Sequence, residues 1–323
     1  MARALIVGIE KYDSVPPLTG CVNDALAMLD VLEFNEDGSP NFDCRILTSP
    51  GRQKITRKLL IKELSKLFEH YDEDVLFYFS GHGHPTELGG FIVTQDAETG
   101  DPGINMNDLL TLANKSTARS VLLILDCCFA GGLGDPSALQ GSERLETKAL
   151  LREGLTILAA SRPMQTAGEA DGYGIFTGLV VAALRGGAAD VRGNVSAAAI
   201  YAYAEQSLGS WEQRPVYKSH AHMLEPVRRC LPSVPDSLLR KLPEIFKNPE
   251  DGFRLAPSYE YTHPSAKREQ VKLFNQFKVL RNARLITTQD NKDLYFVALK
   301  SKKVYLTPLG QYYWQLARAR RIK

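Results

Sequence analysis

The sequence has few cysteines and no long apolar run. Its 323 residues contain five cysteines, scattered and without a pair of CxxC units, so neither a disulfide framework nor a structural zinc site is indicated. No apolar stretch approaches the roughly 20 residues that cross a bilayer. The N-terminus lacks the apolar stretch and small-residue cleavage site of a signal peptide. These absences favour a cytoplasmic protein with no membrane anchor, and they leave thiols available for chemistry.

The chain also has little net charge, but its charges are unevenly distributed. The formal net charge is +2. Residues 265–323 contain 14 Lys and Arg against 3 Asp and Glu, whereas residues 1–264 contain 25 against 34. A basic tail that follows an acidic region predicts two domains with different partners.

Short apolar runs alternate with segments of helical periodicity along the first two thirds of the chain. The runs are 4–9, 44–48, 74–80, 90–94, 120–126 and 154–161, and the helical segments include 22–34, 55–70 and 105–115. This alternation predicts an α/β fold with a mainly parallel six-stranded sheet that helices cover on both faces. In such folds the chemistry lies just beyond the carboxyl ends of the strands.

Two of these runs end in residues that can carry chemistry. "SGHGH" follows one strand and "DCCFAGG" follows another, so His82 and Cys128 are expected at the same edge of the sheet. A histidine at a strand end is on its own more often structural, but an imidazole beside a thiolate is the arrangement that nucleophilic catalysis requires. Cys127 closes the apolar strand and is expected to be a buried packing residue.

These motifs resemble a known family. "YFSGHGH" and "LILDCCFAGG" resemble the histidine and cysteine motifs of caspase-like cysteine peptidases, closest to metacaspases and bacterial caspase homologues. "LTGCVNDA" (18–25) and "ILAASRPMQTAGE" (157–169) resemble further segments of that family. The resemblance covers about residues 2–225 and implies a caspase-like three-layer sandwich. Phe129 and Ala130 replace the His-Ser usual after the metacaspase cysteine, which puts the subfamily in doubt.

The resemblance implies a role for each residue of the motifs. The Cys128 thiolate would attack a peptide carbonyl, and His82 would protonate the leaving amine. The amides of Cys128 and Gly83 would form the oxyanion hole. No Asp or Asn motif for a third member is visible, so the sequence predicts a Cys-His dyad.

By the same resemblance, Asp24, Ser80 and Asp126 would line a pocket for Arg or Lys. Paired carboxylates suit the planar fork of a guanidinium and would repel the Asp side chain that animal caspases prefer. The alternative is structural: Asp24 would cap the following helix, and Asp126 would cap a strand end.

No cofactor and no protein metal site are expected from the motifs, although many metacaspases need Ca²⁺. Asp96, Asp101 and Asp135 lie in loops where a family acidic cluster would be. Hard cations need several oxygen ligands, and only Asp135 falls at a family-like position. A Ca²⁺ requirement is therefore the weaker hypothesis.

The predicted peptidase domain covers residues 1–230. It comprises a large-subunit-like region (residues 1–135), an interdomain loop (residues 136–153) and a small-subunit-like region (residues 154–230). The loop carries Arg144, Lys148 and Arg152, which are suitable targets for self-cleavage by an enzyme that cuts after basic residues. The alternative is an exposed, charged loop that is not processed.

Prolines and short breaks mark residues 231–264 as a connector, with a short helix around 236–247. From 265 to 323 we expect a small, basic α+β domain of winged-helix-like type. Its expected elements are a helix over 266–281, a hairpin from "LYFVALKSKKVYLTPLG" and a helix from about 308. Such a module binds nucleic acid or a protein, and contact with a regulatory partner protein or within the chain is favoured over DNA.

The sequence thus predicts a cytoplasmic cysteine endopeptidase that cleaves protein substrates after Arg or Lys. Some bacterial caspase homologues act in antiphage defence, so the resemblance suggests a regulated bacterial effector. Two alternatives stay open. One is an inactive pseudo-peptidase scaffold, and the other is a DNA-binding or adaptor-type regulator whose caspase-like domain is a scaffold or sensor.

Overall fold

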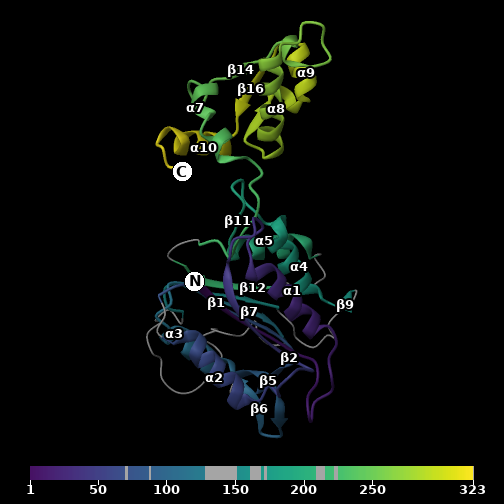
Figure 1. Cartoon of the computed structure of the whole chain (residues 1–323), viewed down its shortest axis with the longest axis vertical. Helices are drawn as coiled ribbons and strands as arrows, with labels where there is room; N and C mark the ends of the chain where they lie inside the picture. Colours follow the sequence, from purple (N-terminus) through teal and green to yellow (C-terminus); the bar gives the residue numbers. More distant parts are fainter. Residues whose placement is uncertain are drawn as a thin grey trace. The chain divides into compact units, whose positions relative to one another are not determined.

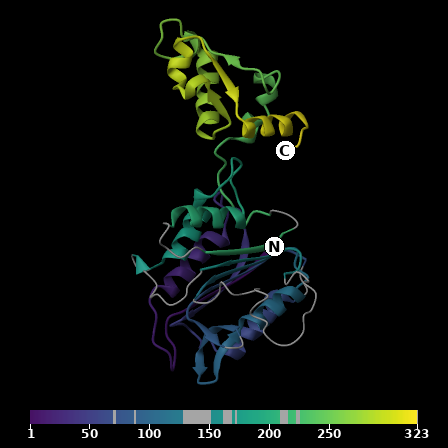
Figure 2. The ribbon, with the colours of Figure 1, turned by 180° about the vertical axis from the view of Figure 1, so that it is seen from behind.

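The computed structural model describes residues 1–69, 72–86, 89–127, 151–160, 169–170, 173–208, 215–221 and 225–322. The chain divides into two compact units (Figures 1 and 2). The first unit comprises residues 1–189 and 194–230, and the second comprises 190–193 and 231–323. No helix in these described ranges is both long enough and apolar enough to cross a membrane.

A six-stranded sheet forms the centre of the first unit. Its strand order is β12-β8-β7-β3-β1-β2, with every pair parallel except β12 and β8. The strands are β1 (Ala2–Ile9), β2 (Phe42–Ser49), β3 (Val75–Ser80), β7 (Val121–Asp126), β8 (Leu155–Ala159) and β12 (Val216–His220). The mainly parallel six-stranded sheet expected from the sequence is confirmed.

One of the six apolar runs lies outside this sheet. The run 90–94 belongs to β5 (Gly89–Glu98), which forms a separate antiparallel sheet with β4 (Gly83–Thr86) and β6 (Asp101–Asn105). Only two residues separate β4 from β5, and so short a connection joins antiparallel strands, since parallel strands need a long crossover. The sixth strand of the central sheet is instead β12, which lies at the edge of the sheet. Its residues are half-buried to exposed, and it contains no apolar run.

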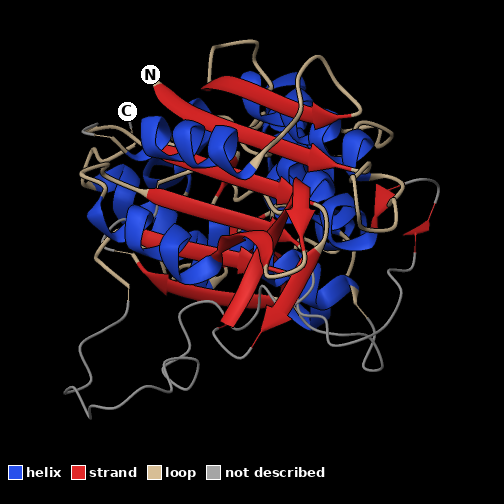
Figure 3. Ribbon diagram, turned by 90° about the horizontal axis from the view of Figure 1, so that it is seen from below, coloured by secondary structure: helices blue, strands red, loops and turns tan. Residues whose placement is uncertain are grey.

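Helices cover both faces of the central sheet, as Figure 3 shows. On one face lie α1 (Cys21–Glu33), α4 (Ile175–Ala182) with the π-turn η3 (Ala183–Gly187), and α5 (Ala197–Ser207). On the other lie α2 (Arg57–Phe68) and α3 (Met106–Lys115). Alternate strand residues supply the two cores: Phe77 packs toward α2 and α3, and Tyr78 toward α1 and α4. This is the three-layer arrangement that the alternating pattern predicts.

The register of the parallel strands brings three strand ends together. Gly8 of β1 pairs with Ser80 of β3, and Ser80 pairs with Asp126 of β7. Because β3 and β7 end side by side, the residues that follow them meet at one edge of the sheet. Four two-residue strands complete the unit: β9 (Glu169–Ala170), β10 (Tyr173–Gly174), β11 (Asn194–Val195) and β13 (Arg228–Arg229).

The second unit has its own apolar core around a small antiparallel sheet of order β14-β16-β15. Its elements are α6 (Asp236–Leu239), α7 (Leu242–Ile245), β14 (Phe253–Arg254), η4 (Pro257–Tyr259), α8 (Arg268–Asn282), β15 (Ile286–Thr288), η5 (Gln289–Asn291), α9 (Leu294–Leu299), β16 (Lys303–Leu306) and α10 (Pro308–Arg318). Residues 231–264, expected to be a connector, instead pack within this unit, since Val234, Phe246 and Leu255 lie in its core.

The hairpin predicted for the second unit is wrong, because residues 294–299, which were expected to form its first strand, form the helix α9. The Asp293 side chain caps this helix by accepting the Tyr295 N–H at 2.8 Å. Leu294, Val297 and Ala298, at helical spacing, are buried on one face. The order of a helix, a two-stranded wing and a helix is therefore not observed, and the winged-helix-like assignment is not confirmed.

Candidate active site

His82 lies two residues beyond the end of β3, and its ring is held in one orientation. Its backbone N–H donates to the Tyr12 hydroxyl at 2.9 Å, and its ring centroid lies 5.0 Å from that of Tyr12. The His82 Nε2 lies 2.8 Å from the Pro16 carbonyl oxygen. Because a carbonyl oxygen only accepts, Nε2 carries the proton in this contact, and Nδ1 is the ring nitrogen that can accept a proton.

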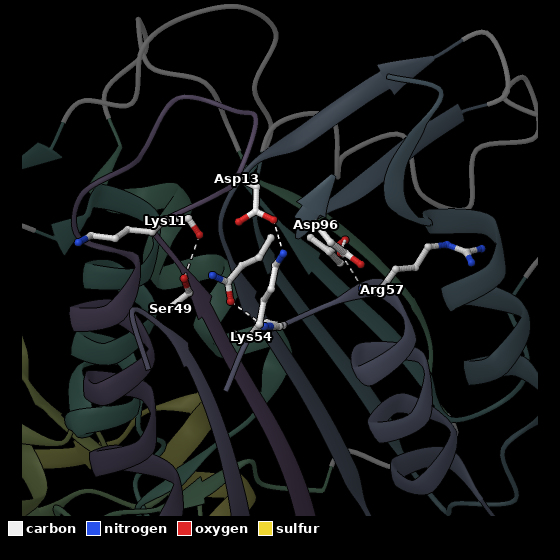
Figure 4. Close-up of polar contacts among 9 residues, drawn as sticks. Lys11, Asp13, Ser49, Lys54, Arg57 and Asp96 are labelled. Atoms are coloured by element: carbon white, nitrogen blue, oxygen red, sulfur yellow. Dashed lines mark hydrogen bonds and ion pairs between the residues drawn. The ribbon is translucent and has the colours of Figure 1, made fainter. Parts of the chain in front are cut away.

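The segment that carries both partners of His82, residues 10–20, is anchored to neighbouring strands (Figure 4). The Ser49 hydroxyl donates to the Lys11 carbonyl at 2.9 Å, and Asp13 forms an ion pair with Lys54. The Asp13 N–H also donates to a backbone carbonyl of β5 at 3.0 Å. The sheet edge therefore fixes the segment that orients the histidine.

Two of the acidic residues considered for Ca²⁺ are engaged in other contacts. Asp96 Oδ1 accepts from the Thr94 hydroxyl at 2.7 Å and from the Arg57 N–H at 2.9 Å (Figure 4). Asp101 pairs with the Arg57 guanidinium at 3.5 Å. Within the described ranges, no group of three His, Cys, Asp or Glu side chains could hold a metal ion. Asp135 lies outside these ranges, and a Ca²⁺ requirement stays a prediction.

Gly83, the expected oxyanion donor, begins β4 opposite Ile92 of β5. The Val93 N–H donates to the His82 carbonyl at 3.0 Å, which makes Gly83 and Ile92 a pair that is not hydrogen-bonded to each other. In such a pair each residue directs its own N–H away from the partner strand. The Gly83 N–H therefore points to the outer edge of β4, as an oxyanion donor requires.

The two neighbouring cysteines differ in how far the structure describes them. Cys127 is 4% exposed and packs in the core that faces α2 and α3, as expected for a packing residue. The expected nucleophile, Cys128, lies outside the described residues. The described chain reaches Cys127, one residue past the point where Asp126 pairs with Ser80 on the strand that leads to His82.

Asp24, Ser80 and Asp126 meet at the same edge, as the family resemblance implies. The Ser80 hydroxyl donates to Asp24 Oδ2 at 3.0 Å, and the Gly174 N–H donates to Asp24 Oδ1 at 3.0 Å. Asp24 and Asp126 are only 2% and 9% exposed. Helix α1 has no side-chain hydrogen bond at its N-cap, so Asp24 does not act as the helix cap that was the alternative for it.

Gly174 shows how closely the two carboxylates approach one another. A Cβ atom placed on Gly174 would lie 2.8 Å from Asp126 Oδ2 and 3.1 Å from Asp24 Oδ2. The two side chains therefore converge on one glycine, where any larger residue would displace them. We call Asp24 and Asp126 the acid pair.

Burial and repulsion from Asp126 perturb the Asp24 member of the acid pair. Burial raises the pKa of Asp24 to about 7, and the nearby Asp126 carboxylate adds to the rise. Burial also raises the pKa of the neighbouring Cys21 thiol to about 12, so this thiol stays protonated. A neighbouring cation would favour the ionised form of Asp24, whereas the protonated Cys21 thiol is not poised as a nucleophile.

The sequence did not reveal two hydroxyl groups that support Asp126. The Thr177 hydroxyl donates to Asp126 Oδ2 at 2.7 Å, and it lies 2.6 Å from the Tyr78 hydroxyl. Since a threonine hydroxyl has one hydrogen, Tyr78 is the donor in the second bond. The available signals were a threonine within the apolar helix segment "IFTGLVV" and a tyrosine within an apolar strand, neither of which identifies a partner.

Arg152, considered as a self-cleavage target, is anchored in the structure. Its guanidinium donates to the carbonyls of Ala113, Ala118 and Glu153 at 3.3, 2.7 and 2.6 Å. This arrangement argues against cleavage after Arg152, because a peptide substrate must present its Arg side chain to the enzyme. Arg144 and Lys148 lie outside the described residues.

A mainly parallel sheet with an oriented histidine and an acid pair at its carboxyl edge, beside the strand that leads toward residue 128, defines an α/β protein with a candidate site at that edge. The family profile described as "Caspase domain" matches residues 1–224. The chain belongs to this family of caspase-like cysteine peptidases.

Individual relatives agree with this assignment. Metacaspase-5 of Trypanosoma brucei brucei is 32% identical over 150 residues, covering 41% of this chain and 29% of that protein. Metacaspase-6 of Arabidopsis thaliana is 32% identical over 163 residues, covering 45% of this chain and 42% of that protein. The chain thus spans less than half the length of these relatives. This chain shares its fold with the crystal structure of caspase-1 from Spodoptera frugiperda, with a TM-score of 0.50 and 16% sequence identity. The match covers 71% of this chain and 90% of the caspase-1 chain.

We expect Tyr12→Phe to lower kcat/KM for peptide cleavage by about tenfold. The change removes the hydroxyl that accepts the His82 N–H and donates to the Ile9 carbonyl at 3.1 Å, and it leaves the ring in place. Steady-state kinetics at several pH values would measure the effect, and a melting curve would show whether the fold persists. Unchanged kinetics and an unchanged pH profile in the folded variant would contradict a positioning role for Tyr12.

We expect Asp24→Asn to stabilise the protein at high pH. The pKa of Asp24 rises from an ordinary 3.8 to about 7 on folding, so its ionisation destabilises the fold increasingly as pH rises from about 4 to 7. At about 1.4 kcal/mol per pKa unit, the cost above pH 7 is on the order of 4 kcal/mol. Melting temperatures of the two proteins should therefore differ at pH 8 and converge near pH 4. Asp30→Asn, on the exposed side of α1, is the control. A difference that does not vary with pH would refute the buried-carboxylate account.

Proposed function

We propose that this protein is a cysteine endopeptidase that cleaves protein substrates after Arg or Lys. The observation that carries the proposal is the position of His82, with its ring fixed by the Pro16 carbonyl, at the edge where β7 leads to Cys128. The caspase-domain family of the chain supports the reaction class. The acid pair at the same edge supports the specificity.

The proposed reaction uses groups at that edge in two steps. The Cys128 thiolate attacks the carbonyl carbon of the scissile bond, while the His82 imidazolium gives the Nδ1 proton to the leaving amine. The Gly83 N–H and the Cys128 N–H stabilise the oxyanion. Water then hydrolyses the acyl-enzyme, with neutral His82 accepting its proton. Throughout, the Pro16 carbonyl holds Nε2–H and stabilises the imidazolium, so the dyad has a backbone partner that the sequence did not indicate.

The acid pair supplies the proposed preference for a basic residue before the cut. An Arg side chain would gain charge-assisted hydrogen bonds from carboxylates held in a nearly dry environment. Its charge would also offset the burial and the repulsion from Asp126 that raise the pKa of Asp24. An Asp side chain would add a third negative charge, so cleavage after Asp is expected to be poor.

For the second unit we propose recruitment of a regulatory partner protein, which would make the chain a regulated bacterial effector, with antiphage defence as one setting. The supporting observation is a pair of exposed aromatic rings, Tyr295 and Phe296, at 40% and 52% exposure on a basic unit. The competing function is a DNA-binding or adaptor-type regulator with an inactive caspase-like scaffold. A salt-dependent mobility shift without peptidase activity would favour the competing function.

We expect Cys128→Ala to abolish peptide cleavage and Cys127→Ala to retain much of it. Only Cys128 occupies the nucleophile position of the motif, whereas Cys127 is a buried packing residue. His82→Ala should be similarly inactive, and His84→Ala, an exposed neighbour on β4, should be mildly affected. Kinetics on the four folded variants would test this. Equal losses within either pair would show that the catalytic residue is misassigned.

We expect Asp126→Ala to lower kcat/KM for Arg substrates by at least about tenfold, since breaking a buried charge pair weakens binding strongly. Lys substrates should also be affected, while alkylation of the thiol by a small reagent should change much less. Both rates would be measured on the same folded variant, with Asp30→Ala as the surface control and matched Arg and Asp peptides for the native protein. Undiminished Arg cleavage in Asp126→Ala, or a native preference for Asp, would remove the basic-residue pocket.

A further inference from the structure

A cavity of about 490 Å³ opens beside His82, on walls that the acid pair does not share. Its lining includes His82 itself, the start of β4, residues of β5 and β6, and the tip of the 10–20 segment at Val15. None of Asp24, Ser80 and Asp126 lines it. The cavity, which we call the β5 cavity, is therefore lined by His82 but not by the acid pair.

The walls of the β5 cavity are mainly apolar. Val93 and Ala97 are only 3% and 4% exposed and form its buried portion, and Phe91, Val15 and Pro102 are half-buried around them. Phe91 and Val93 lie two residues apart on β5, so both point to the same face of that strand. A site of this size and lining suits an apolar side chain.

The ionisable side chains of this lining are the exposed Glu98 and His84 and the half-buried His82. Because the lining holds imidazoles as well as a carboxylate, its charge does not decide for or against an acidic side chain. The chemistry of the walls thus separates side chains by burial: apolar ones gain by it, and glycine gains nothing.

The proposed reaction fixes which portion of a substrate can reach this cavity. The side chain before the cut is directed to the acid pair. The leaving amine must lie within hydrogen-bond reach of His82 to receive its proton. The chain that follows that amine therefore passes the histidine on the side where His82 forms the cavity wall.

We propose that the β5 cavity is a leaving-group pocket that binds a large apolar side chain, of leucine or phenylalanine size, from the residue after the cut. This inference rests on the proposed endopeptidase function. It adds a second determinant of specificity: the preferred cleavage site is a basic residue followed directly by a large apolar one.

The test uses internally quenched peptides with Arg before the cut that differ only in the next residue: Leu, Phe, Gly or Asp. With the full-length protein, we expect kcat/KM for Leu and Phe to exceed that for Gly by at least about tenfold, as burial of such a side chain allows. Asp, whose carboxylate gains nothing from burial against apolar walls, should be cleaved no faster than Gly. Mass spectrometry of the products would establish that every peptide is cut after Arg.

Variants of the half-buried walls would connect the preference to the cavity. Phe91→Ser and Val15→Ser each remove apolar surface, so each should lower the Leu-to-Gly ratio of kcat/KM by about fivefold or more. Phe34→Ser, an exposed aromatic residue at the end of α1 that does not line the cavity, is the matched control and should leave the ratio unchanged. The ratio is informative even where a variant lowers overall activity, because both peptides are measured on the same protein.

The possible outcomes distinguish this inference from the function on which it rests. If no peptide is cut after Arg, the proposed function fails, and the leaving-group pocket fails with it. If all four peptides are cut after Arg at similar rates, or Gly or Asp is preferred, the function stands and the pocket is wrong. A preference for Leu that both wall variants leave intact would also overturn the pocket.

Discussion

Two carboxylates, those of Asp24 and Asp126, are buried beside one another at the carboxyl edge of the central sheet, and much of the local structure follows from keeping them there. Burying like charges together is unfavourable unless hydrogen bonds and protonation compensate. The Ser80 hydroxyl, the Gly174 amide and the Thr177 hydroxyl each donate to the pair. Because Gly174 has no side chain, its backbone lies close to both carboxylates without displacing them.

This arrangement costs stability, and in the proposed function the same carboxylates recognise a basic side chain. Burial and, after it, the Asp126 carboxylate raise the pKa of Asp24, so the fold opposes a full negative charge at Asp24. A bound guanidinium would remove that opposition, so some of the lost stability would be recovered only when a suitable substrate is present. Destabilised polar groups of this kind are typical of binding sites rather than of structural cores.

His82 differs from the acid pair, because its contacts hold it in one orientation and do not destabilise it. Tyr12 holds its backbone, the Pro16 carbonyl holds its ring, and the segment carrying both is tied to the end of β2 and to β5. In the proposed reaction, that backbone carbonyl thereby selects which ring nitrogen transfers the proton. That contact could not be read from the sequence, because any residue supplies a carbonyl and only the folded segment places it.

Features that a local stretch of sequence encodes could be predicted, whereas features that depend on contacts between distant segments could not. The mainly parallel sheet, most helices and the position of His82 at the sheet edge followed from apolar runs and motif positions, whereas the convergence of Asp24, Ser80 and Asp126 was implied by the family resemblance. The placement of β5 and β12 depended on pairing partners distant in sequence, and α9 depended on its Asp293 cap and buried face, which override a strand-like composition. Thr177 and Tyr78 support the acid pair only through the packing of α4 on β3, which no local pattern encodes.

The most direct test of the central claim is to label the native full-length protein with a peptidyl chloromethyl ketone ending in Arg and to map the modified residue by mass spectrometry. The reagent places its side chain in the specificity pocket and alkylates the catalytic thiol without needing a residue after the cut. The account predicts a single adduct on Cys128, formed much faster than with the matching Asp reagent and lost in Cys128→Ala. An adduct on Cys127 or another residue, or faster labelling by the Asp reagent, would contradict it.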